Sequence, residues 1–157
     1  MSQIEQLSSE PAQIIRPERT LDIIRGTCRL LVELGASPIL EWTLANGRRA
    51  DIAALDLRDE LLIVEVKSCR ADFEADDKWQ DYLAFADRFY FAVDRDFPQE
   101  LLPEECGLIV SDRYGGAILR ESPYVKLAPA RRKAAMTRFA RHAADRLILS
   151  TVLRAAD

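Results

Sequence analysis

A glutamate and a lysine stand two positions apart at the end of an apolar run, in the stretch LLIVEVKSCRAD at residues 61–72. A charged side chain in such a place is costly unless it is paired or binds a metal. Alternate residues of a strand point to the same face of a sheet, so Glu65 and Lys67 are expected on one side. A site on that side would offer a carboxylate and an ammonium together.

A second acid is placed to join them. Asp51 lies in the stretch RADIAALDL at residues 49–57, which follows the hairpin signal Asn46-Gly47. The hairpin makes 49–57 the antiparallel neighbour of the strand before it, and a short link makes 61–68 the next neighbour. Asp51 could then face Glu65 across the sheet.

Two carboxylates and an adjacent backbone carbonyl form a pocket of hard oxygen ligands, which suits magnesium or manganese. Lys67 could orient or deprotonate a water, whose pKa the metal would lower while it offset phosphate charge. These are the parts needed to hydrolyse a phosphodiester. Simpler interpretations stay open: Glu65 could form a structural ion pair with Lys67 or Arg49, and Asp51 could be an ordinary hairpin residue.

The composition bounds the setting of this chemistry. The chain has 157 residues, 48% of them apolar, with a net charge of −4 and a pI near 5.2. These values fit one globular domain at 17–157, preceded by a flexible arm at 1–16. No run has membrane-spanning length, the N-terminus does not read as a signal peptide, and the three cysteines lack ligand-like spacing, so we expect a cytoplasmic protein with reduced thiols and no membrane partner.

The pattern of elements predicts an α/β protein with a mixed central sheet flanked by helices. The expected order is α-β-β-β-α-β, then two short strands and a C-terminal helix. The expected elements are a helix from Pro17 to Gly35, strands at 38–44, 49–57, 61–68, 89–93, 107–112 and 117–121, a helix at 71–88, and a last helix from Pro129 to about Leu153.

This arrangement resembles the PD-(D/E)XK nuclease superfamily through RRAD at 48–51 and VEVK at 64–67, with thirteen residues between Asp51 and Glu65. A closer resemblance is to the MmcB-like family of bacterial DNA repair proteins. It rests on RGTCRLLVELG, EWTLANGRRADIAAL, IVEVKS, DDKWQDY, DRFYFAV, FPQELLPEECGLIVSD and LAPARRKAAMTRFAR. The resemblance implies a restriction-endonuclease-like fold and a setting of DNA damage repair or mutagenesis.

The resemblance also implies roles for single residues. Asp51 matches the motif aspartate, Glu65 the second acid and Lys67 the lysine, while Ala50 stands where the superfamily has proline. A further acid often completes such metal sites from the first strand or helix. Glu41 is favoured because it is a lone charge in an apolar strand, although it could also face solvent, and the alternatives are Glu18 and Glu33.

Positive charge for DNA is sought in two places. Six basic residues lie within sixteen positions of the last helix, and Arg131, Arg138 and Arg141 share one face of it. Close to the acid pair, the candidates for DNA contact are Arg48, Arg49 and Lys78. Contact with phosphates would position DNA without reading its sequence, and a solvated helix face is the simpler alternative.

Two functions follow from these patterns. The first is a Mg²⁺- or Mn²⁺-dependent nuclease that hydrolyses DNA phosphodiester bonds through Asp51, Glu65 and Lys67. The second is a catalytically inactive accessory protein that uses the nuclease-like fold to bind DNA or a protein partner in repair or mutagenesis. A homodimer is compatible with either function, because some enzymes of this fold work as dimers.

Overall fold

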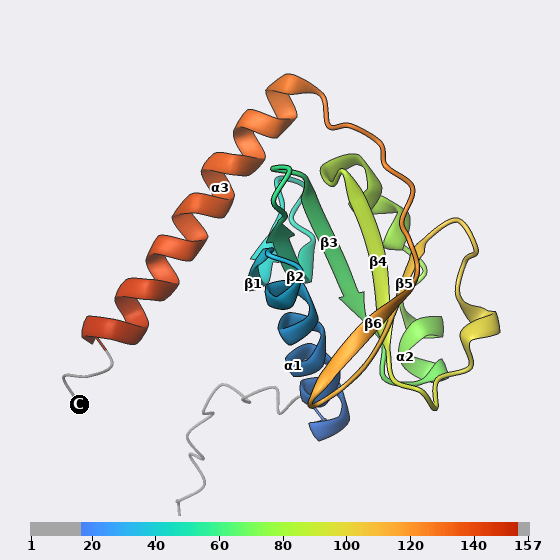
Figure 1. Cartoon of the computed structure of the whole chain (residues 1–157). Coiled ribbons are helices and arrows are strands. Elements are labelled where there is room, and N and C mark those ends of the chain that lie inside the picture. Colours follow the sequence, from blue (N-terminus) through green and yellow to red (C-terminus); the bar gives the residue numbers. More distant parts are fainter. Residues whose placement is uncertain (1–16, 154–157) are drawn as a thin grey trace, which may run out of the picture.

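The computed structural model describes residues 17–153 and contains a six-stranded sheet whose strands follow the order of the sequence (Figure 1). The expected arm at 1–16 lies outside the described residues. The β1–β2, β2–β3 and β5–β6 pairs are antiparallel, whereas β3–β4 and β4–β5 are parallel, so the mixed sheet is confirmed. The strands are β1 (Ser37–Thr43), β2 (Arg49–Leu55), β3 (Leu61–Val66), β4 (Arg88–Val93), β5 (Gly107–Asp112) and β6 (Gly115–Arg120).

Helix α1 (Glu18–Glu33) covers one face of the sheet. Its apolar side chains recur at helical spacing, and Ile23 and Leu31 pack with Ile52 and Val64 of the central strands. The helix ends at Glu33, and the chain turns away at Gly35. Its φ of +82° is unstrained because glycine has no Cβ. None of the helices within residues 17–153 is long and apolar enough to cross a membrane.

An aromatic cluster covers the other face. The ring of Trp79 stacks on Phe89 with centroids 6.0 Å apart, and Phe89 meets Phe91 edge-on at 5.1 Å. Because α1 lies on one side and this cluster on the other, all six residues of β3 are buried. The central strand is therefore buried on both faces, and Glu65 and Lys67 at its end are buried with it.

The prediction of one helix over residues 71–88 is wrong. The chain forms a short helix α2 (Arg70–Ala75), leaves helical geometry at Asp76 (φ −123°, ψ 97°) and continues as the 3₁₀ helix η1 (Trp79–Phe85). The Asp76 carboxylate accepts the backbone N–H of Lys78 at 3.2 Å, which replaces a helical hydrogen bond by a local turn. The break also lets the side chains of Trp79 and Tyr82 turn into the core.

The last helix, α3 (Pro129–Ile148), ends in a π-helical turn, η3 (Leu149–Leu153), in agreement with the expected boundary. Phe139 is buried and meets Trp42 of β1 edge-on, with ring centroids 6.2 Å apart. Leu147, about two turns further along the helix, is 67% exposed. The first part of α3 therefore docks on the β1 side of the sheet, and its final turns extend away from it (Figure 1).

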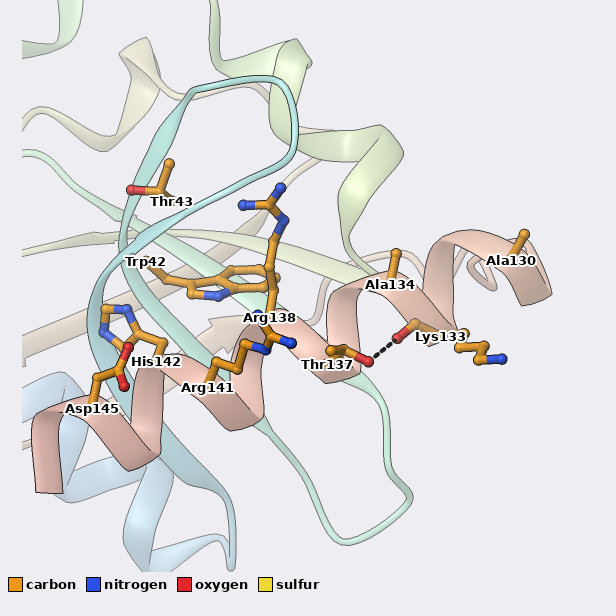
Figure 2. Close-up of a pocket in the computed structure, with 10 residues that line it drawn as sticks. All are labelled: Trp42, Thr43, Ala130, Lys133, Ala134, Thr137, Arg138, Arg141, His142 and Asp145. Atoms are coloured by element: carbon orange, nitrogen blue, oxygen red, sulfur yellow. Dashed lines mark hydrogen bonds between the residues drawn. The ribbon is translucent and has the colours of Figure 1, made fainter. Parts of the chain in front are cut away.

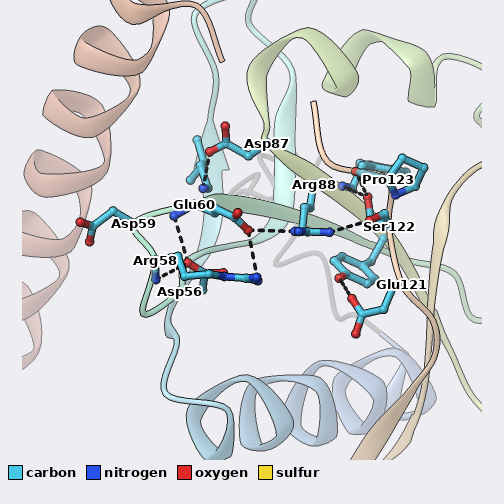
Figure 3. Close-up of polar contacts among 12 residues, drawn as sticks. Asp56, Arg58, Asp59, Glu60, Asp87, Arg88, Glu121, Ser122 and Pro123 are labelled. Atoms are coloured by element: carbon cyan, nitrogen blue, oxygen red, sulfur yellow. Dashed lines mark hydrogen bonds and ion pairs between the residues drawn. The ribbon is translucent and has the colours of Figure 1, made fainter. Parts of the chain in front are cut away.

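Asp87 lies beside the start of β3 (Figure 3) and connects this strand to α3. Its carboxylate is fully buried and accepts the backbone N–H groups of Leu61 at 2.7 Å and Leu127 at 2.9 Å. It also pairs with Arg132 of α3. One side chain thus joins the start of β3, the segment before α3 and α3 itself, and sequence reasoning did not find this residue.

We expect Asp87→Ala to lower the free energy of unfolding by about 3–5 kcal/mol, because the change leaves Arg132 and two backbone donors without their acceptor. Asp77→Ala, which removes an exposed acid, is the control and should change it by about 0.5 kcal/mol or less. Urea unfolding followed by circular dichroism measures both. A loss below about 1 kcal/mol for Asp87→Ala would show that α3 is held mainly by other contacts.

Candidate functional site

Asp51 and Glu65 meet where β2 begins and β3 ends. The antiparallel register pairs Ile52 with Val64, and the next position along it sets Asp51 opposite Glu65, on the same face. The backbone N–H of Asp51 donates to Glu65 Oε1 at 3.1 Å, and that of Val66 donates to Asp51 Oδ2 at 2.9 Å. Each carboxylate is therefore held by a main-chain donor of the other strand.

Glu65 is the buried member of this pair, with 5% of the residue exposed. Burial, followed by the charge of Asp51, raises the pKa of Glu65 to about 8, although the Asp51 N–H and the Lys67 charge act in the other direction. Among residues 17–153, Glu65 forms no ion pair within 4.0 Å with Lys67 or Arg49. The structural ion pairs considered for Glu65 are therefore not formed.

Lys67 is as deeply buried, with 4% exposed, and its Nζ lies 3.5 Å from Asp76 Oδ2. Lys67 is thus paired with a carboxylate, but with that of Asp76 and not with that of Glu65. Asp76 is shared, because Arg48 approaches its other oxygen at 3.0 Å. Partial burial acts to raise the pKa of Asp76, but hydrogen bonds from Arg48 and the Lys78 N–H, with the Lys67 charge, lower it below its usual value.

The structure does not gather a third acid with Asp51 and Glu65. No group of three or more His, Cys, Asp or Glu side chains within residues 17–153 is arranged to hold a metal ion. Glu41, the favoured third ligand, has a φ of +52° in β1, and its carboxylate lies 3.7 Å from Arg146 of α3. Its alternatives Glu18 and Glu33 lie on α1, which covers the opposite face of the sheet.

The basic residues expected near the acid pair divide into two kinds. Arg48 is half-buried, pairs with Asp76 and lies 5.1 Å over the Tyr82 ring, so its charge is used within the protein. Arg49 and Lys78 are exposed. The Arg49 carbonyl accepts the Tyr82 hydroxyl at 2.9 Å, which fixes the start of β2 against η1.

Asp76 is the residue that sequence reasoning underrated. An acidic run at residues 72–77 is by itself typical of a solvated helix start, where carboxylates favour the helix dipole. The carboxylate of Asp76 instead contacts both Lys67 and Arg48. The sequence did hold a signal for a turn at Asp76-Asp77. Aspartate favours turns as well as helix starts, because its side chain can accept a backbone N–H two residues on. Contact with Lys67 could not be read from spacing.

The fold and this site define a mixed α/β protein with a buried acid pair and a buried lysine at one end of its central strands. The chain belongs to the family of MmcB-like DNA repair proteins, whose model matches residues 9–153. A solved structure described as the SPO1766 protein of unknown function from Silicibacter pomeroyi is similar, with 43% identity and a TM-score of 0.84. The match covers 89% of this chain and 96% of that one. A comparison with curated proteins found no match.

The raised pKa of Glu65 predicts how stability depends on pH. The folded state holds the Glu65 proton to a pKa of about 8 and the unfolded state to the usual 4.5, so the folded state binds more protons between these values. The free energy of unfolding should therefore fall as pH rises through this window, by about 2–4 kcal/mol. Glu65→Gln should remove this fall and match or exceed wild-type stability at pH 8.

Urea unfolding at pH 5, 6, 7 and 8.5 measures this difference. Glu104→Gln changes an exposed glutamate in the same way and should keep the wild-type pH dependence. Parallel curves for wild type and Glu65→Gln would mean that Glu65 is ionised throughout and that its burial is compensated.

Proposed function

We propose that this chain is a metal-dependent deoxyribonuclease with a restriction-endonuclease-like core, acting in DNA repair. The observation that carries the proposal is the face-to-face placement of Asp51 and Glu65. Lys67, two residues after Glu65 and just beyond β3, is buried with them. Family membership supports a role in DNA repair, and the acid pair supports hydrolysis as its chemistry. Paired carboxylates in a desolvated site attract a cation strongly, because their mutual repulsion is relieved by it.

The donor set fits magnesium or manganese. Mg²⁺ is commonly bound by one or two carboxylates, with waters and substrate phosphates completing its shell, and Asp51 and Glu65 supply those two carboxylates. A bound ion of this kind acidifies a water and offsets phosphate charge. The backbone N–H groups of Asp51 and Val66 would keep the two carboxylates oriented.

Lys67 brings positive charge to the same face as Glu65. Its partner Asp76 is shared with Arg48, so this group of three side chains carries one net positive charge. That excess favours an anionic phosphate next to Lys67, whose Nζ can donate to a phosphate oxygen or orient the attacking water. In the reaction, the water oxygen bonds to phosphorus, the bond from phosphorus to one ester oxygen breaks, and that oxygen takes up a proton.

The alternative is a catalytically inactive member of the fold that binds DNA or a repair partner. One observation favours it: Lys67 contacts Asp76, an arrangement that also suits a structural ion pair. In that case the acid pair would serve no chemistry, and the wild type would not cleave DNA with either metal.

We expect Lys67→Ala to reduce cleavage about 10²-fold or more, with little loss of metal affinity, because the metal ligands are Asp51 and Glu65. The assay incubates wild type and variant with single-stranded, duplex and branched DNA in Mg²⁺ and in Mn²⁺. Lys126→Ala is the matched control, because it removes an exposed lysine that is not part of the candidate site, and it should cleave DNA like wild type. An inert wild type would support the accessory function, and equal cleavage by all three proteins would place the active site elsewhere.

Metal binding is tested separately by stability. At pH 8, Mg²⁺ or Mn²⁺ at ten times its Kd should stabilise the wild type by about 1.4 kcal/mol. Asp51→Asn and Glu65→Gln should lose this gain, whereas Lys67→Ala should keep it. The measurement is the urea midpoint with metal and with EDTA. A gain that survives both acid substitutions would show that the metal binds at another place.

A further inference from the structure

One face of α3 and the neighbouring part of β1 line a surface cavity of about 770 Å³ (Figure 2). The lining positions of α3 recur every three or four residues and so belong to one side of the helix. Three of them are basic, Lys133, Arg138 and Arg141, and Asp145 is the single acid. The cavity therefore carries a net positive charge on a chain whose total charge is −4.

The six basic residues of α3 differ in what they contact. Arg131 donates to the Ala84 carbonyl at 2.8 Å, Arg132 pairs with Asp87, and Arg146 lies near Glu41. These three are used to dock the helix. The other three line the cavity, and their charged ends form no ion pair within 4.0 Å in residues 17–153.

Trp42 supplies a second, independent observation. The residue lines the cavity from β1 and is 2% exposed, and its buried indole Nε1 has no hydrogen-bond acceptor among the described residues. A buried donor without an acceptor costs about 1–3 kcal/mol, so an acceptor from a bound molecule would be favoured. Figure 2 shows the Trp42 ring among the α3 side chains, with Arg138 extending beside it.

We propose that this cavity binds the phosphates of a DNA strand and leads the strand to the acid pair. A phosphate oxygen would accept from the Trp42 N–H, while Arg138 and Arg141 would neutralise its charge. In the sheet register Trp42 of β1 pairs with Ala50 of β2, and Asp51 follows Ala50 along that strand, so the cavity adjoins the strand that carries Asp51. The basic side chains that line the cavity suit phosphates, which carry no sequence information, so binding is expected to be independent of sequence.

This inference rests on the proposed function for its choice of DNA, but its test contains no cleavage step. A fluorescein-labelled 20-nucleotide strand and its duplex are titrated with protein in EDTA, and anisotropy is followed from 50 to 200 mM salt. Arg138→Ala/Arg141→Ala is compared with Arg25→Ala/Arg29→Ala, which removes two exposed arginines from α1 on the opposite face of the sheet.

We expect the α3 double variant to bind DNA at least about tenfold more weakly than the α1 double variant. Its plot of log affinity against log salt should be shallower by about 1.4 for the single strand or 1.8 for the duplex, as for two lost phosphate contacts. Equal affinities and slopes for the two double variants would overturn the proposal, as would a wild type that binds neither DNA at 50 mM salt.

Trp42→Phe tests the indole donor, since it keeps an aromatic ring next to Phe139 and removes the N–H together with part of the ring volume. Binding should weaken about tenfold, the loss expected for a hydrogen bond to a charged group. Wild-type affinity, in a variant whose circular dichroism shows it folded, would overturn the role of Trp42. Binding through α3 without any cleavage would reject the nuclease proposal alone, and cleavage with equal binding by both double variants would reject the cavity alone.

Discussion

The burial of β3 on both faces is the constraint on which the rest of the structure depends. α1 packs on one side and the aromatic cluster on the other, so the strand has no solvated face. Glu65 at its end is therefore removed from water, and the nearby Asp51 adds repulsion. The same packing that stabilises the core makes this carboxylate hard to ionise, which is the property that a metal site can use.

Two aspartates place the remaining elements around that strand. Asp87, buried beside the start of β3, holds the chain before α3 and the Arg132 side chain of α3. Asp76 works at the opposite end, where it holds Lys67 and Arg48 and breaks the helix that the sequence suggested. Both are charged groups whose energetic cost is offset by several hydrogen bonds, and each fixes the segments that surround it.

Charge is distributed unevenly over this acidic chain. The shared cluster of Lys67, Asp76 and Arg48 gathers charge after the end of β3, and the basic side of α3 gathers charge next to β1. A negative total charge does not exclude contact with DNA, because phosphates respond to the local field within about a Debye length, near 8–10 Å in physiological salt. The three cavity-lining basic residues are close enough in sequence to act on one strand of DNA together.

The sequence by itself determined the sheet and the acid pair. The Asn46-Gly47 turn and the apolar runs on either side of it specify neighbouring strands, and strand periodicity then requires Asp51 and Glu65 to share a face. The family followed from motifs spread along the chain. These features are local or involve adjacent strands, so spacing along the chain is enough to find them.

Only the tertiary structure decided the partners of the charged side chains. Asp87 contacts Arg132 across 45 positions, and the carboxylate of Glu41, the expected metal ligand, lies 3.7 Å from Arg146 of α3. The basic residues of α3 look alike in the sequence. In the structure, Arg131 and Arg132 bind groups of the protein itself, whereas Arg138 and Arg141 line the cavity with Trp42. Such contacts depend on how α3 docks, and docking is set by the whole core rather than by any pattern within the helix.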